Sequence, residues 1–355
     1  MCSPNIGAEQ NSDASIDSTL AIGAPAGGPE EVAAAAGRQV LPPIRSALGA
    51  GDWDSARQQM LQLAIFVGQS HDLRGLEALK EILTEGEPST LLAMSLLLFD
   101  VSREALGSRQ FLVSTVTRQA AFACLDRLES TPGVPTALVA DAYTLIGAQL
   151  QSSGSSSASG DSFRRAVKLD PQLGPARLGL GIYLDQLGNT AEAVDVFGQL
   201  PPIQPHHGEA SLRRAVALIH LDRERPAQRA LEALVDPNAA SPPEPWVQSV
   251  AYQELAMMRL RDEGPRAALD VLETSVQRLP DDQRLRLLLA FVHSTLGRRA
   301  AAASVLDAVE TRPDQVGELS PRRRLAEWHL EVPTGLAERL REHAEASIAT
   351  GTLTP

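Results

Sequence analysis

Cysteine and lysine are scarce in this chain of 355 residues. The two cysteines, Cys2 and Cys124, are too few for a disulfide framework or a four-cysteine zinc site, so they leave the redox compartment open. The only lysines, Lys80 and Lys168, lie outside any glycine-rich loop. The phosphate-binding loop of nucleotide hydrolases needs a lysine in such a loop, so the sequence disfavours that class of enzyme.

Long apolar runs and a positive net charge are missing as well. The most apolar stretch, residues 91–99, is half the length of about 18 residues that a membrane-spanning helix needs. The 32 basic and 44 acidic residues give a formal charge of -12, which is the wrong sign for a protein that binds by neutralising phosphates. We therefore expect no membrane-spanning segment and no nucleic-acid partner.

Candidate catalytic and metal-binding groups do not converge in the sequence. The adjacent His206 and His207 follow a proline-rich segment, where they fit a solvated turn better than a zinc site, which needs three or four ligands. Cys124 stands among apolar neighbours, which indicates burial and not the access that a reactive thiolate needs. We expect no catalytic residue, no cofactor and no metal, and so no enzyme.

Residues 1–28 are predicted to form a disordered tail. Cys2 and the polar residues that follow it resemble the mature end of a bacterial lipoprotein, although an ordinary disordered N-terminus has the same composition. The expectation is a cytoplasmic protein. The alternative is a periplasmic lipoprotein with a lipid anchor at Cys2.

The rest of the sequence is typical of helices. From Pro29 onward, apolar residues lie three and four apart, and Gly, Pro, Asn and Asp interrupt them. Strand-like alternation does not occur. We expect helices near residues 30–48, 53–67, 71–85, 88–99, 109–129, 135–152, 161–169, 174–187, 190–199, 208–221, 225–235, 245–263, 265–278, 282–296, 299–311, 320–330 and 334–348.

A period of 34 residues runs through the second half of the chain. Small residues recur at this interval, as do large apolar ones, and the period resumes after an insertion at residues 239–245. Examples are Ser159, Ala193 and Ala227; Phe163, Phe197 and Leu231; Gly147, Gly181 and Ala215; Ala268 and Ala302; and Leu272 and Leu306. A fixed period of this length indicates stacked units that bury their faces on each other.

The segment LGLGIYLDQLGNTAEAVDVFGQL at residues 178–200, followed by Pro205, resembles a tetratricopeptide repeat. Residues 143–150 and 163–171 resemble another, and weaker copies extend the resemblance over residues 140–314. It implies an all-α fold, an α-solenoid of antiparallel helix pairs. The expected organisation is a helical region with degenerate repeats at 29–135, a repeat array at 136–316 and C-terminal capping helices with a short tail at 317–355.

The resemblance also implies a binding surface, because the first helices of tetratricopeptide repeats line a concave groove. One subgroup grips a terminal carboxylate there with Lys and Asn, and this chain has neither at the corresponding positions. The expected groove is apolar and suits an amphipathic helix or an apolar peptide. Its predicted partner-binding residues are Leu178, Ile182, Leu212, Val216, Met257, Leu287 and Phe291.

The sequence thus favours a non-catalytic protein-binding scaffold or assembly factor. The alternative is the tethered lipoprotein that organises an envelope assembly, such as a pilus, polysaccharide export or cell-wall machinery. If the groove is open, aspartate at Ile182 or Val216 should reduce binding more than stability. Two other possibilities stay open: the groove side chains pack within a tight solenoid, or another part of the chain covers them.

Overall fold

A computed structural model describes residues 28–68, 73–84, 86–154, 156–202, 204, 206–239, 241–307 and 335–351. Within these residues every regular element is a helix, which confirms the predicted all-α class. The chain divides into two compact units, residues 1–124 and 125–355, and the division falls inside helix α5 (Phe111–Ser130). The predicted tail at 1–28 lies outside the described residues up to residue 27, and so do Cys2, Pro205 and the expected helix at 320–330.

The first unit contains α1 (Pro29–Gly49), α2 (Trp53–Gly68), α3 (Leu73–Thr84), α4 (Pro88–Gly107) and the beginning of α5. Proline stands at the start of α1 and of α4, where its missing N–H has no helical partner to lose. Helix α1 packs against α2 and α3, and α2 packs against α4. The predicted helix at 88–99 continues to Gly107 because Val101 and Ala105 are buried as well.

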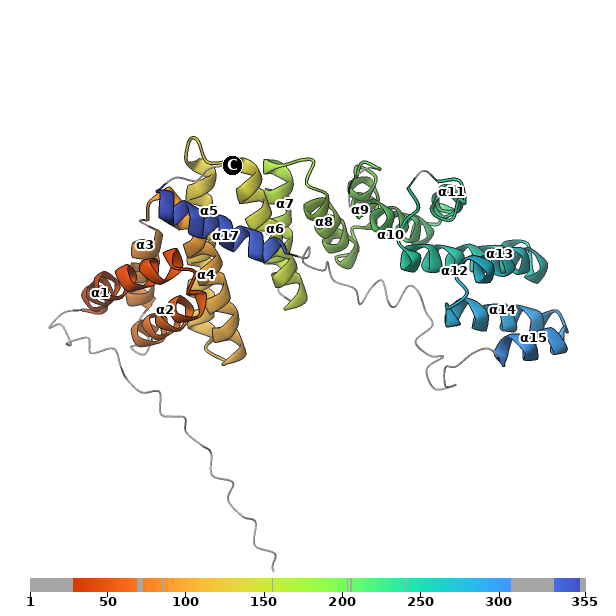
Figure 1. Ribbon diagram of the computed structural model, residues 1–355, viewed down its shortest axis with the longest axis horizontal. Coiled ribbons are helices and arrows are strands. Elements are labelled where there is room, and N and C mark those ends of the chain that lie inside the picture. The colour runs from red at the N-terminus through yellow and green to blue at the C-terminus, as the bar shows by residue number, and fades with distance from the viewer. Residues whose placement is uncertain are drawn as a thin grey trace, which may run out of the picture. The chain divides into compact units, whose positions relative to one another are not determined.

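The second unit is built from helix pairs that follow one another along the chain (Figure 1). The two helices of each pair contact each other, and the second helix of a pair contacts the first helix of the next. The pairs are α6 (Thr136–Ser152) with α7 (Ser156–Leu169), α8 (Gly174–Gln186) with α9 (Thr190–Phe197), α10 (His207–His220) with α11 (Glu224–Leu234), α12 (Pro245–Asp262) with α13 (Pro265–Arg278), and α14 (Gln283–Thr295) with α15 (Arg299–Leu306). This arrangement confirms the predicted α-solenoid.

The 34-residue period corresponds to the packing between helices. Ser159, Ala193 and Ala227 are fully buried, as small residues must be where two helices approach closely. The larger residues four positions later, Phe163, Phe197 and Leu231, are buried as well. A Cβ added to Gly147 would lie 2.9 Å from Cε1 of Phe163, so glycine makes room for the ring.

Helix α7 begins at Ser156, five residues before the predicted start. The predicted helices leave out residues 153–160, a stretch rich in serine. The structure shows that small residues of this stretch pack against α8. A Cβ at Gly160 would collide with the ring of Tyr183, and Ser159 and Ser162 are buried. Close approach of the two helices, and not helix propensity, explains why this stretch is helical.

The last described helix, α17 (Leu336–Thr350), packs against α6 in the first pair of the array (Figure 1). Leu336, Leu340, Ala344 and Ser347 are buried along one side of α17. Glu338, Arg339 and Glu342 are exposed.

Candidate functional site

We define the inner-face positions of the array as two residues in the first helix of each pair, one turn apart and in the same phase of the repeat. They are Thr144 and Ala148 in α6, Leu178 and Ile182 in α8, Leu212 and Val216 in α10, Gln253 and Met257 in α12, and Leu287 and Phe291 in α14. These positions include all seven residues that the sequence predicts for partner binding.

Four of the predicted residues are buried inside the array. Leu178 and Ile182 belong to a hydrophobic core cluster that also contains Phe163 and Phe197. Leu212 and Val216 belong to the next cluster, around α10, α11 and α12. The expectation that aspartate at Ile182 or Val216 mainly affects binding is therefore wrong, because a carboxylate there would enter the core.

The other three predicted residues lie at α12 and α14, which contact each other. Met257 is 48% exposed and Phe291 is 54% exposed, while Leu287 is half-buried. Exposed large apolar side chains are uncommon among the described residues of the second unit. The structure thus brings apolar surface to equivalent positions of two adjoining helices, which is where a partner can reach it.

At α6 the inner face bears a carboxylate that the sequence analysis does not single out. Asp141 lies three residues before Thr144 and seven before Ala148, so the three share one face of the helix. Burial raises the pKa of Asp141, and the guanidinium of Arg339 in α17 acts in the opposite direction. Helix α17 packs against α6, and the positive charge of its Arg339 acts on the carboxyl of Asp141.

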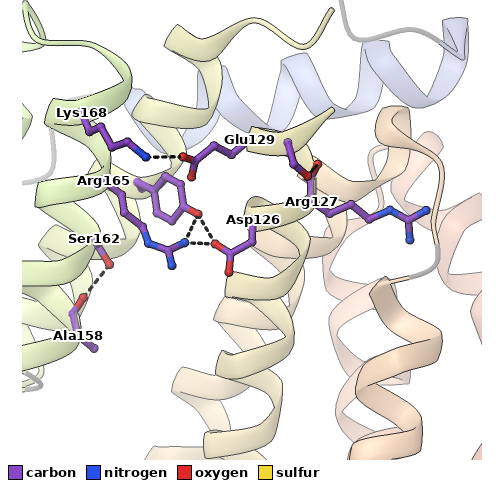
Figure 2. Close-up of polar contacts among 9 residues, drawn as sticks. Asp126, Arg127, Glu129, Ala158, Ser162, Arg165 and Lys168 are labelled. Carbon is purple, nitrogen blue, oxygen red and sulfur yellow. Dashed lines mark hydrogen bonds and ion pairs between the residues drawn. The ribbon is translucent and has the colours of Figure 1, made fainter. Parts of the chain in front are cut away.

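A polar network joins the end of α5 to α6 and α7 (Figure 2). The hydroxyl of Tyr143 donates to Oδ1 of Asp126 at 2.7 Å and accepts from Nη1 of Arg165 at 2.8 Å. Arg165 also forms an ion pair with Asp126, and Lys168 forms one with Glu129 at 3.4 Å. Burial raises the pKa of Tyr143, so its hydroxyl stays protonated and holds the three helices together.

The contacts of His207 and Cys124 support the packing of the chain. The Nδ1 atom of His207 lies 3.1 Å from the carbonyl of Leu200, and its Nε2 atom lies 3.3 Å from Oγ of Ser211, so the ring closes the turn before α10. Cys124 is buried as predicted, with its Sγ atom 3.8 Å from the carbonyl of Leu83. Within the described ranges no three His, Cys, Asp or Glu side chains converge as metal ligands would.

None of the described helices has the length and hydropathy to cross a bilayer. Two arginines that follow or precede another arginine in the sequence form ion pairs: Arg164 pairs with Asp161 at 3.1 Å and Arg213 with Glu209 at 2.8 Å. Exposed pairs such as Arg164–Asp161 contribute little free energy, about 0 to 1 kcal/mol. The Arg164–Asp161 pair belongs to the solvated surface, whereas the side chains of Arg213 and Glu209 are largely buried.

No family model and no curated protein matches the sequence. Solved structures with a similar fold include a tetratricopeptide repeat protein from Parabacteroides merdae, with 15% identity over 72% of this chain and 99% of that one, at a TM-score of 0.44. Others are residues 41 to the end of MamA from Desulfovibrio magneticus (23% identity; 52% and 96% of the chains; TM-score 0.38) and YrrB, described as a tetratricopeptide protein with an unusual peptide-binding site (18%; 52% and 89%; 0.36). This chain is similar to them in its succession of packed helix pairs.

Proposed function

We propose that this chain is a non-catalytic protein-binding scaffold, and that its partner docks on the inner face of α12 and α14. The observation that carries the proposal is the exposure of Met257 and Phe291 at equivalent positions of adjoining helices. The same positions in α8 and α10 are buried, so the solenoid itself does not need these side chains exposed. Arrays of helix pairs offer extended surfaces of this kind to partners.

The partner that fits is the apolar side of an amphipathic helix or an apolar peptide. Met257 offers a flexible, polarizable side chain that adapts to different shapes, and Phe291 offers a large flat surface. Leu287, one turn before Phe291, extends the same face. Contact of this kind is driven by burial of apolar area, at about 25 cal/mol per Å², and should depend little on salt.

The test is a comparison of captured proteins between three forms of the full chain. Met257→Asp combined with Phe291→Asp should remove partners that the wild-type protein retains, as measured by affinity purification with quantitative mass spectrometry. The matched control is Leu187→Asp, because Leu187 is 51% exposed but lies at the end of α8, outside the inner-face positions. Loss of the same proteins in both variants, or in neither, would contradict the proposal.

The lipoprotein alternative depends on Cys2, outside the described residues. It predicts a diacylglycerol adduct on that cysteine in protein purified from the native host. Intact-mass measurement of the N-terminal peptide decides between the two, since an unmodified thiol in the membrane-free fraction supports the cytoplasmic form.

A further inference from the structure

Helix α17 has the features of a ligand of the array. Its buried residues form a single narrow stripe, with Leu336, Leu340, Ala344 and Ser347 spaced by four, four and three positions. The remaining faces carry charged residues. An amphipathic helix with anchors at this spacing is the form in which helical peptides bind to grooves.

Helix α17 packs against α6. Asp141 shares a face of α6 with the inner-face positions Thr144 and Ala148, and Ala148 also belongs to the core cluster around Phe163. Arg339 of α17 interacts favourably with Asp141 across the contact. The contact therefore combines apolar burial with one pair of opposite charges, which fixes the orientation of the bound helix.

The connection between α15 and α17 is long enough for α17 to act as a tethered ligand of the array. Helix α15 ends at Leu306 and α17 begins at Leu336, so 29 residues, 307–335, join them. A chain of that length reaches at most about 100 Å when extended. A ligand tethered in this way binds in cis at an effective concentration that depends on the length of the connection.

We propose that the inner face of α6 is a binding site for an amphipathic helix, that α17 occupies it in cis, and that a partner helix of the same chemistry displaces α17. The matching partner has apolar or small residues spaced by four, four and three, and a basic residue three positions after the first of them. The proposal rests on the proposed function in assigning partner binding to the inner face, but its site is α6 and not α12 and α14.

The experiment uses a fluorescent peptide of residues 334–351 and the full-length protein. Wild-type protein should bind it weakly, because α17 competes in cis. Leu340→Asp, which places a carboxylate in the buried stripe of α17, should bind the wild-type peptide at least about tenfold more tightly, as measured by fluorescence polarisation. A peptide that carries the same substitution should bind neither protein.

Two further variants control for folding. Glu342→Ala changes an exposed residue of α17 and should match the wild-type protein. Arg339→Glu also changes an exposed residue, so the array remains folded, and it should strengthen peptide binding by weakening the attraction to Asp141. Equal peptide affinity in wild type, Leu340→Asp and Arg339→Glu would overturn the proposal, as would unfolding of the array in Leu340→Asp, which would make α17 part of the core.

Hydrogen exchange locates the bound peptide. At saturating peptide, amides of residues 336–350 in the wild-type chain should exchange faster, because α17 has been displaced. Unchanged exchange at saturation would overturn the proposal. Met257→Asp combined with Phe291→Asp should leave peptide binding unaffected; if it abolishes peptide binding, the site is α12 and α14, which refutes this inference and supports the proposed function.

Discussion

Val216 in α10 and Phe291 in α14 hold the same position of the repeat, yet the first is buried and the second is 54% exposed. Both helices begin a pair, and each packs against the first helix of a neighbouring pair. Between them lies the seven-residue insertion at 239–245, and beyond it the inner-face residues Met257 and Phe291 reach the surface. The period of the repeat therefore specifies which residues join the helices of a pair, but it does not specify which inner-face positions are exposed.

The largest effect should come from a direct test of this contrast. Val216→Asp places an unpaired charge in a core cluster and should lower the free energy of unfolding by roughly 3 to 5 kcal/mol. Phe291→Asp places the same charge at an exposed site, so it should change stability by no more than about 0.5 kcal/mol. Urea unfolding followed by circular dichroism measures both. Equal destabilisation would show that Phe291 is part of the core.

Overpacking of the helix contacts should have the next largest effect. Ala193→Leu or Ala227→Leu adds volume at fully buried positions between helices and should destabilise the array by about 1 to 3 kcal/mol. Ala303→Leu, at an exposed position of α15, is the matched control and should be close to neutral. Thermal unfolding distinguishes them, and a stable Ala193→Leu variant would contradict the packing described for α8 and α9.

Tyr143→Phe should have a moderate effect at the α6 end. The substitution removes the hydroxyl that bonds to Asp126 and Arg165, whereas their ion pair remains. The loss should be about 1 kcal/mol, within the usual range for one net hydrogen bond. Arg164→Ala, which removes an exposed ion pair on the same helix as Arg165, should cause a smaller change in chemical denaturation, and the reverse order would contradict the role of the network.

The smallest effect concerns Asp141. Burial raises the pKa of its carboxyl above the ordinary value of 3.8, so the folded protein disfavours the ionised form. Ionisation of Asp141 therefore destabilises the folded protein. This destabilisation is absent below about pH 3.8 and appears as the pH rises through the pKa of Asp141 in the folded protein. Asp141→Asn should therefore raise the melting temperature slightly at pH 7 and leave it unchanged near pH 3. Asp195→Asn, at an exposed site of α9, is the matched control for the change of side chain.

Most of the fold follows from local sequence patterns. The apolar spacing and the breaks at Gly and Pro place the described helices, and the period of 34 places the residues that join them. The start of α7 is the clearest failure, since serine and glycine are poor helix formers and the close approach of Gly160 to Tyr183 depends on the packing of α7 against α8.

The candidate site was less accessible to sequence reasoning. Helical phase alone assigns Leu178 and Phe291 to the same surface. The phase of a residue in its helix does not tell whether a neighbouring helix covers that residue. The packing of α17 against α6 joins residues that are about 200 positions apart in the chain, and no local sequence pattern encodes it. One signal is present in the sequence: Asp141 is the only charged residue in α6, and the charge of Arg339 in α17 acts on it.

The glycine and phenylalanine contacts link residue sizes across the array. An added Cβ at Gly181 would collide with the ring of Phe197. In the next pair the corresponding residues are Ala215 and Leu231, which share a core cluster: a methyl group is gained on one helix and an aromatic ring is replaced by a smaller side chain on the other. Volume is thus conserved over two positions and not at each one. Gly181→Ala should consequently be tolerated together with Phe197→Leu. Sequence differences between repeat units therefore occur as paired substitutions at contacting positions.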